Sequence, residues 1–212
     1  MSANITIRVP DWLDRIVAWP LLAYRKHKYG LPFRKIPLGD SFFSIVSPED
    51  FYWLNKFHWS RKKSQSNFYA VRILNDGCKE SKLFSMHREI MNPPKGFLVD
   101  HKNLNSLDNT RTNLRLATRS QNMFNRKKIK TATSSRFIGV CFYKRTKKWC
   151  AYIRIGGKLI WLGSFDNEID AAKAYDAAAK KYHGEFARLN FPERSEGPRA
   201  EQLRRITHGN LY

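Results

Sequence analysis

Residues 99–126 read VDHKNLNSLDNTRTNLRLATRSQNMFNR, a stretch in which acidic, imidazole and amide side chains recur at short spacings. A short apolar strand ends at Asp100, a polar loop rich in Asn occupies residues 101–112, and a second short strand covers residues 114–117. Ser120 is a residue type that begins helices, so we expect a helix after it. The stretch therefore predicts a strand–loop–strand–helix unit. It carries four candidate site residues: Asp100, His101, Asn113 and Asn122.

These side chains combine two kinds of chemistry. The carboxylate of Asp100 and the amide oxygen of Asn122 are hard ligands that suit magnesium or manganese. The imidazole of His101 can take a proton near neutral pH, and phosphodiester hydrolysis uses both a metal and a base. Neighbours on a regular strand point to opposite faces, so Asp100 and His101 share a site only where the strand ends or twists. An alternative stays open, because Asp and Asn in loops are commonly turn formers.

The stretch resembles the motif of HNH homing endonucleases of the phage and intron-encoded type. The resemblance rests on Asp100-His101, on the Asn-Leu pair at 113–114, and on the helix that carries Asn122 and Asn125. Met86-His87-Arg88 and the sequence SPEDFYWLNKFHW at 47–59 extend it over residues 36–126.

This family has a ββα-metal active site, and the resemblance assigns its roles residue by residue. His101 would be the general base, and Asp100 and Asn122 would hold one divalent metal. Asn113 would brace the loop and orient His101. Asn122 stands where other members have His, which points to magnesium or manganese rather than zinc. His87 lies outside the motif, and we expect it to be structural.

Residues 136–192 predict a second unit of three strands and one helix. Residues 137–143 and 149–155 alternate as strands, a Gly-Gly turn follows, and residues 159–163 form a third strand. Asp166 or Asn167 is expected to cap an Ala-rich helix, EIDAAKAYDAAAKKYH. The predicted apolar stripe of this helix comprises Ile169, Ala172, Tyr175, Ala179 and Tyr182.

This second unit resembles the plant Apetala and ethylene-response-factor type of DNA-binding domain. The matching residues are Gly139-Val140, Trp149, Ala151, Ile153-Arg154, Trp161-Leu162-Gly163, Phe165, the AAKAYDAAA helix and Leu189-Asn190-Phe191-Pro192. The resemblance implies that three antiparallel strands enter the major groove of DNA and that the helix packs behind them. Sequence preference should differ from that of the plant proteins, because Cys141, Tyr143 and Tyr152 replace charged residues of the plant pattern.

Alternation along the strands divides their side chains between two faces. We expect Trp149, Ala151, Ile153, Ile160 and Leu162 to pack on the helix. We expect Cys150, Tyr152, Arg154, Leu159 and Trp161 to face outward, with Tyr143 and Arg145 extending that face. Arg154 is the candidate for a base contact, and Lys144, Lys147, Lys148 and Lys158 suit phosphate contacts. The alternative is an ordinary module with a solvated basic face.

The composition agrees with a nucleic-acid partner. The chain has 212 residues, and 39 Lys and Arg against 18 Asp and Glu give a net charge of +21. This excess favours a polyanion, either nucleic acid or an anionic membrane surface. Three cysteines without a CxxC spacing disfavour a disulfide scaffold and a thiolate zinc site. No apolar run approaches the length of a spanning helix, so we expect a cytoplasmic protein that is not secreted.

The other segments are less informative. Residues 1–35 form an arm of unknown role, in which Pro10, Pro20 and Pro32 are expected to break any long helix. Residues 127–135 read as a basic linker, and residues 193–212 read as a polar, mobile tail.

The predicted fold class is α+β, with a ββα-metal nuclease domain at 36–126 and a three-stranded antiparallel sheet packed on one helix at 136–192. The predicted function is a two-domain endonuclease that hydrolyses duplex DNA with one divalent metal, acts as a monomer and takes no small-molecule substrate. A phage or mobile-element origin is implied by the resemblance alone. Two alternatives stay open: a non-catalytic DNA-binding regulator and a binder of structured RNA.

Overall fold

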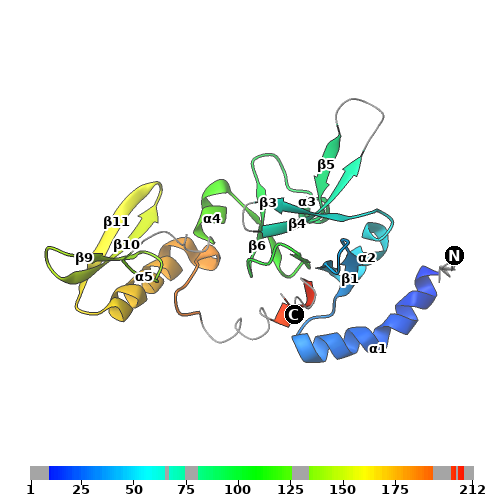
Figure 1. Ribbon diagram of the computed structural model, residues 1–212, viewed down its shortest axis with the longest axis horizontal. Helices are drawn as coiled ribbons and strands as arrows, with labels where there is room; N and C mark the ends of the chain where they lie inside the picture. Colours follow the sequence, from blue (N-terminus) through cyan, green and yellow to red (C-terminus); the bar gives the residue numbers. More distant parts are fainter. Residues whose placement is uncertain are drawn as a thin grey trace. The chain divides into compact units, whose positions relative to one another are not determined.

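The structure is a computed structural model that describes residues 10–64, 67–74, 81–125, 134–192, 202–203 and 205–207 (Figure 1). The chain divides into two compact units. The first combines Met1–Asn92, Asn105–Arg115 and Pro198–Tyr212, and the second combines Pro93–Leu104 with Leu116–Gly197. Residues 127–133 of the predicted linker lie outside the described residues.

The first unit contains two three-stranded sheets. β1 (Arg34–Pro37) pairs antiparallel with β2 (Phe43–Val46), and β7 (Asp108–Asn109) runs parallel to β2. β3 (Ser60–Ser64), β4 (Asn67–Leu74) and β5 (Lys82–Ser85) form an antiparallel meander. Two short helices, α2 (Pro48–Leu54) and α3 (Met86–Met91), pack on these sheets. Its fully buried side chains include Ile45, Val46, Leu54, Trp59 and Met86.

The N-terminal arm is a helix, so the expectation that prolines break it was wrong. α1 (Asp11–Tyr29) starts after Pro10 and continues through Pro20 to a left-handed Gly30. The helix tolerates Pro20 because it is largely exposed, so water can bond the carbonyl that proline leaves unpaired. Asp14 ties it to β1 through an ion pair with Arg34 and to α2 by accepting a hydrogen bond from the Tyr52 hydroxyl. None of the described helices has the length and hydropathy that a membrane span requires.

The C-terminal residues that the structure describes pack into the first unit, contrary to the expected mobile tail. Leu203 is buried against Phe33 and Ile45, and Asn105 donates a hydrogen bond to the buried Thr207 hydroxyl. The sequence did not indicate this packing, because two apolar positions among charged neighbours form no periodic pattern.

The second unit holds the predicted three-stranded sheet. β10 (Lys148–Ile155) lies between β9 (Val140–Tyr143) and β11 (Lys158–Phe165), all antiparallel, with a bulge between Ala151 and Tyr152. The sheet packs on α5 (Glu168–His183), as Figure 1 shows. Small side chains at the contact, including Ala151, Ala171, Ala172 and Ala179, let helix and sheet approach closely. The predicted fold class is confirmed for this part.

The buried side of α5 differs from the predicted stripe. Ala172, Tyr175 and Ala179 are buried as expected, but Ile169 and Tyr182 are exposed. Ala171, Asp176 and His183 are buried with the first three, so the buried face is rotated toward them. Asn167 caps the helix as predicted, by accepting a hydrogen bond from the Asp170 amide.

A strand–helix element completes the second unit. β6 (Leu98–His101) and β8 (Leu114–Ala117) form a two-stranded sheet, and α4 (Arg119–Phe124) packs against β6. Thr118 caps α4 in place of the predicted Ser120, and its side chain and that of Gln121 form a reciprocal capping box. A Gln lies three residues after Thr118 but not after Ser120, and this difference explains the choice.

Candidate active site and nucleic-acid interface

Asp100 and His101 lie at the end of β6 and are both buried, with exposed fractions of 5% and 7%. The side-chain amide of Asn125 donates hydrogen bonds to the two carboxylate oxygens of Asp100, at 3.1 and 3.0 Å. The same amide contacts the backbone carbonyls of His101 at 3.0 Å and Lys102 at 3.4 Å. One side chain at the end of α4 therefore fixes both the strand end and its carboxylate.

Asn122 precedes Asn125 by three residues, which places both on one side of α4. Because Asn125 reaches Asp100, this side of α4 is the one that meets the end of β6. Asp100, His101 and Asn122 thus belong to one strand–helix element of the second unit.

Asn113 belongs to the first unit, where its side-chain amide donates to the Asp108 carbonyl at 2.7 Å. This contact braces the chain between β7 and β8. The role that the resemblance assigns to Asn113, bracing the loop and orienting His101, stays a prediction.

Asn105 and Asp108 of the 101–112 loop act as turn formers, as the alternative interpretation expected for such residues. Asn105 accepts from the Leu107 amide, and Asp108 accepts from both the amide and the hydroxyl of Thr110. Asn109 donates to the hydroxyl of Ser44 at 2.8 Å. These contacts explain the Asn-rich composition without assigning it to chemistry.

The donor set around Asp100 fits a hard cation. Both carboxylate oxygens of Asp100 accept from the Asn125 amide, and a carboxylate is a hard oxygen ligand. The amide oxygen of a residue such as Asn122 on α4 is a donor of the same hardness. Within the described part of the chain no three His, Cys, Asp or Glu side chains group as metal ligands.

The outer face of β10 and β11 carries the predicted nucleic-acid contacts. Trp161 is 60% exposed and lies opposite Tyr152, and Leu159 lies opposite Arg154. The Arg154 guanidinium donates to the Gly157 carbonyl at 2.8 Å, which holds it at the β10–β11 turn. Tyr143 is exposed on β9, and Arg145 and Lys147 are exposed in the turn between β9 and β10. Lys158 is exposed as well, but it pairs with Ile155, which packs on the α5 side of the sheet, so it does not extend the outer face.

Cys150 lies on the outer face but is buried, with its sulfur 3.3 Å from the Ser164 hydroxyl. One expectation about the faces was wrong. Ile160 is 40% exposed because it lies near the hairpin end. Lys148 pairs with Asp166, so its charge is partly neutralised.

Two segments of the chain match family models. Residues 135–185 match the model for the AP2 domain, with the sheet and helix described above. Residues 135–185 form an AP2 domain. Residues 91–124 match the model for an HNH endonuclease, and this HNH segment contains Asp100, His101, Asn113 and Asn122.

The relatives share the AP2 domain with this chain. The chain is 48% identical over 58 residues to the AP2-like ethylene-responsive transcription factor TOE2 of Arabidopsis thaliana, covering 27% of this chain and 12% of that protein. It is 48% identical over 62 residues to dehydration-responsive element-binding protein 2C of Arabidopsis thaliana, covering 26% and 18%. APETALA2-like protein 2 of Oryza sativa subsp. indica is 48% identical over 58 residues, covering 27% and 13%. The chain therefore spans less than a fifth of the length of these relatives.

Several residues that mark the AP2 domain are structural. Asn190 accepts a hydrogen bond from the Ile138 amide and donates to the Ile138 carbonyl, at 2.7 and 3.2 Å. The buried Asp176 carboxylate accepts from the amides of Asn190 and Phe191, each at 2.8 Å. These contacts fasten Asn190 and Phe191 to the segment before β9 and to α5, so both residues help to hold the fold together.

The outer face of the AP2 domain carries uncharged residues at positions where the plant pattern has charged residues. Cys141 and Cys150 are cross-strand partners, and Tyr152 lies beside them. Burial, followed by the neighbouring Cys150 and Cys141, raises the pKa of Tyr152, so its phenol stays neutral.

Sequence reasoning missed His183 at the end of α5. Its Nε2 lies 3.0 Å from the Arg154 carbonyl, and its ring stacks on Phe124 of α4 with a centroid separation of 3.8 Å. His183 therefore joins the AP2 helix to the helix of the HNH segment. Its position at the helix end was the available signal, but that position is equally typical of a solvated residue.

Proposed function

We propose that this protein is a metal-dependent DNA endonuclease of the homing type, in which the AP2 domain binds duplex DNA and the HNH segment hydrolyses a phosphodiester bond. The observation that carries the proposal is the buried Asp100-His101 pair at the end of β6, fastened by Asn125 to a helix that also carries Asn122. A strand end permits the two neighbouring side chains to serve one site, as the chemistry requires.

The proposed roles follow from the donor chemistry. Asp100 and Asn122 hold one divalent cation, magnesium or manganese, in a ββα-metal arrangement. Such a cation, when bound, neutralises charge on the scissile phosphate and on the leaving oxygen. His101 removes a proton from the attacking water, and Asn113 braces the loop and orients His101. The products are a 3′-hydroxyl and a 5′-phosphate.

The AP2 domain supplies affinity and register. Arg154 is suited to a base contact, Tyr143, Tyr152 and Trp161 to apolar contacts in the groove, and Arg145, Lys147 and Lys158 to phosphates. Joining the two activities in one chain raises the effective concentration of the cutting site at bound DNA. We propose that the protein acts as a monomer inside a cell and belongs to a phage or another mobile element.

A plasmid-nicking assay tests the proposal. Wild type should convert supercoiled plasmid to the nicked or linear form with magnesium and should stop on addition of EDTA. His101→Ala should lose at least about a hundredfold in rate, the contribution typical of general base catalysis. His58→Ala, at an exposed histidine, is the matched control and should cut like wild type. Equal cutting by wild type and His101→Ala, or no cutting by wild type, contradicts the proposal.

A second candidate function is a non-catalytic DNA-binding regulator. It is favoured by the curated relatives, which are transcription factors and element-binding proteins by name. Under this alternative the protein binds duplex DNA with sequence preference and leaves supercoiled plasmid intact. The same assay, paired with a duplex-binding measurement, therefore separates the two functions.

A further inference from the structure

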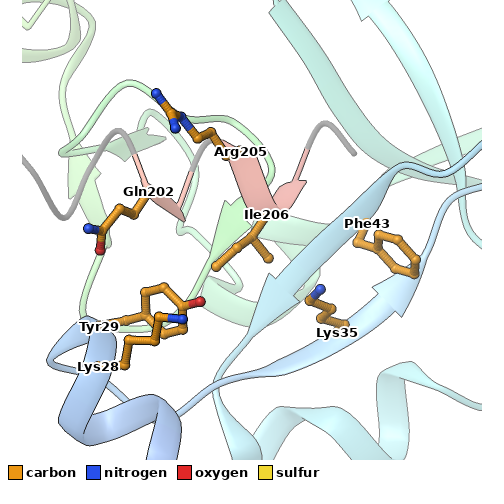
Figure 2. A pocket seen from close by; sticks show the side chains of 7 residues that line it. All are labelled: Lys28, Tyr29, Lys35, Phe43, Gln202, Arg205 and Ile206. Carbon is orange, nitrogen blue, oxygen red and sulfur yellow. The ribbon is translucent and has the colours of Figure 1, made fainter. Parts of the chain in front are cut away.

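A pocket of about 450 Å³ opens in the first unit, and the residues that line it lie outside the two segments that match family models. Figure 2 shows Lys28 and Tyr29 at the end of α1, Lys35 on β1 and Phe43 on β2, facing the C-terminal residues that carry Arg205 and Ile206. In this view Ile206 lies between Tyr29 and Lys35, and Arg205 points away from the two lysines. Residues 28–43 and the C-terminal residues Gln202, Arg205 and Ile206, which are far apart in sequence, thus build one pocket.

The charge of the pocket is positive and unbalanced. Its lining includes Lys28, Lys35 and Arg205 and contains no carboxylate among the residues that the structure describes. In the same described set, none of these three cations has a carboxylate within salt-bridge distance. Elsewhere in the first unit, Arg34, Arg61, Arg72 and Arg111 each have an acidic partner.

The surroundings of Lys35 destabilise its charged form. Burial, reinforced by the nearby Arg25 guanidinium, lowers the pKa of Lys35. Arg25 is itself half-buried, and burial together with Arg34 lowers its pKa. A bound anion would offset this repulsion, because opposite charges attract more strongly where water is partly excluded.

Aromatic rings line the same pocket. The Lys35 amine lies 5.1 Å from the centre of the Phe43 ring, and the Lys28 amine lies 5.5 Å from the centre of the Tyr29 ring. Lys28 is also held by the Tyr24 hydroxyl at 2.9 Å. Amines set against rings can bond a phosphate while the rings and Ile206 contact an attached sugar or base.

We propose that this pocket binds a phosphate ester of a nucleotide, and that its source is the backbone of a nucleic-acid strand. Lys28 and Lys35 bond the phosphate oxygens, and Tyr29, Phe43 and Ile206 contact the nucleoside. The site adds an anchor on the first unit to the contacts of the AP2 domain. It does not require the chain to cut DNA, so its failure and that of the nuclease proposal are distinguishable.

The test compares full-length variants in EDTA, where cutting cannot occur. Lys28→Met/Lys35→Met removes both amines but keeps the apolar stems. Lys26→Met/Lys56→Met removes the same charge from exposed positions of the first unit outside the pocket. Binding to a random-sequence duplex is measured over a range of salt concentrations, and thymidine 5′-monophosphate is titrated by calorimetry.

We expect the pocket variant to bind duplex at least about tenfold more weakly than the control variant, since hydrogen bonds to charged groups contribute about that much. Its salt slope should fall by about one relative to the control, because one phosphate contact is lost. Thymidine 5′-monophosphate should bind wild type and the control but not the pocket variant. Lys28→Arg/Lys35→Arg should retain duplex binding, which separates lost charge from misfolding.

Two outcomes would overturn the assignment to a strand. If both double variants bind duplex equally and thymidine 5′-monophosphate binds neither wild type nor control, the pocket is not a phosphate site. If the nucleotide binds wild type saturably while duplex affinity is the same for both variants, the phosphate site is upheld but its source is free nucleotide.

Discussion

Gly139 shows how tightly one residue of the AP2 domain is constrained. Its backbone has φ +72°, and a Cβ added there would lie 2.1 Å from the Tyr175 ring and 2.6 Å from the Tyr152 carbonyl oxygen. The clash is with a buried ring and with backbone, neither of which can move easily. Glycine is therefore required here for both conformation and space.

Gly139→Ala should destabilise the protein by about 2 kcal/mol or more, because overpacking adds to the left-handed strain. Gly157→Ala is the matched control, since its φ is +82° but nothing lies within 4 Å of the added Cβ. It should cost only about 1 kcal/mol. Chemical denaturation of the full chain measures both. Equal losses would show that the ring contact is unimportant.

The hydrogen bonds from Asn125 to Asp100 give a second prediction at the residue scale. Replacing it with Ala removes the donors to Asp100, and the buried carboxylate is then held less firmly. We expect Asn125→Ala to lower the nicking rate by about tenfold and to raise the magnesium concentration needed for half-maximal rate, as loss of an outer-shell partner does. Asn55→Ala, at the exposed end of α2, is the control. A lower rate with no change in magnesium dependence would assign Asn125 a purely structural role.

Tyr175 gives the stability of the AP2 domain a pH dependence. Burial, with a smaller contribution from the Asp176 carboxylate, raises the pKa of Tyr175 above its ordinary value of about 10. The folded state therefore favours the neutral phenol, and the resulting stability is present below about pH 10 and lost as pH rises through the folded pKa. Thermal unfolding should show a steeper alkaline decline for wild type than for Tyr175→Phe. Parallel declines would contradict this origin.

At the scale of elements, the sequence predicted what rests on local patterns. Alternation predicted the strands of the AP2 domain, composition predicted its helix, and capping chemistry predicted the cap at Asn167. The resemblance singled out Asp100 and Asn122 as candidate site residues. The contact from Asn125 to Asp100 joins residues 25 positions apart, and only the packing of α4 on β6 brings them together. Pro20 led to a wrong expectation because proline removes one backbone hydrogen bond from a helix, and an exposed helix can replace that bond with one to water.

The cap of α4 offers a test at this scale. Thr118→Ala should destabilise α4 by about 1 kcal/mol, because the amide of Gln121 loses its acceptor. Ser120→Ala lies two residues away inside the helix and should have little effect or a slight benefit, since Ala is a better helix former. Because α4 carries Asn122 and Asn125, nicking should fall with Thr118→Ala and not with Ser120→Ala. Equal effects would show that the capping box does not hold the helix.

At the scale of the molecule, binding and cutting are assigned to different surfaces, so they should be separable by mutation. Arg154→Ala/Trp161→Ala removes a cation and an exposed ring from the outer face of the AP2 sheet. Lys181→Ala/Tyr182→Ala removes the same two kinds of side chain from exposed positions on α5, a helix packed against that sheet.

The outer-face variant should bind duplex about tenfold or more weakly, since a bidentate base contact alone contributes about 1–3 kcal/mol. The α5 variant should bind nearly as wild type does. At saturating DNA the outer-face variant should still nick at close to the wild-type single-turnover rate, because Asp100, His101 and Asn122 are unchanged. His101→Ala should do the reverse and bind fully without cutting.

A loss of single-turnover nicking in the outer-face variant at saturating DNA would mean that the AP2 domain does more than bind. The stack of His183 on Phe124 would then be the first contact to examine, because it joins the AP2 helix to the helix that carries Asn122.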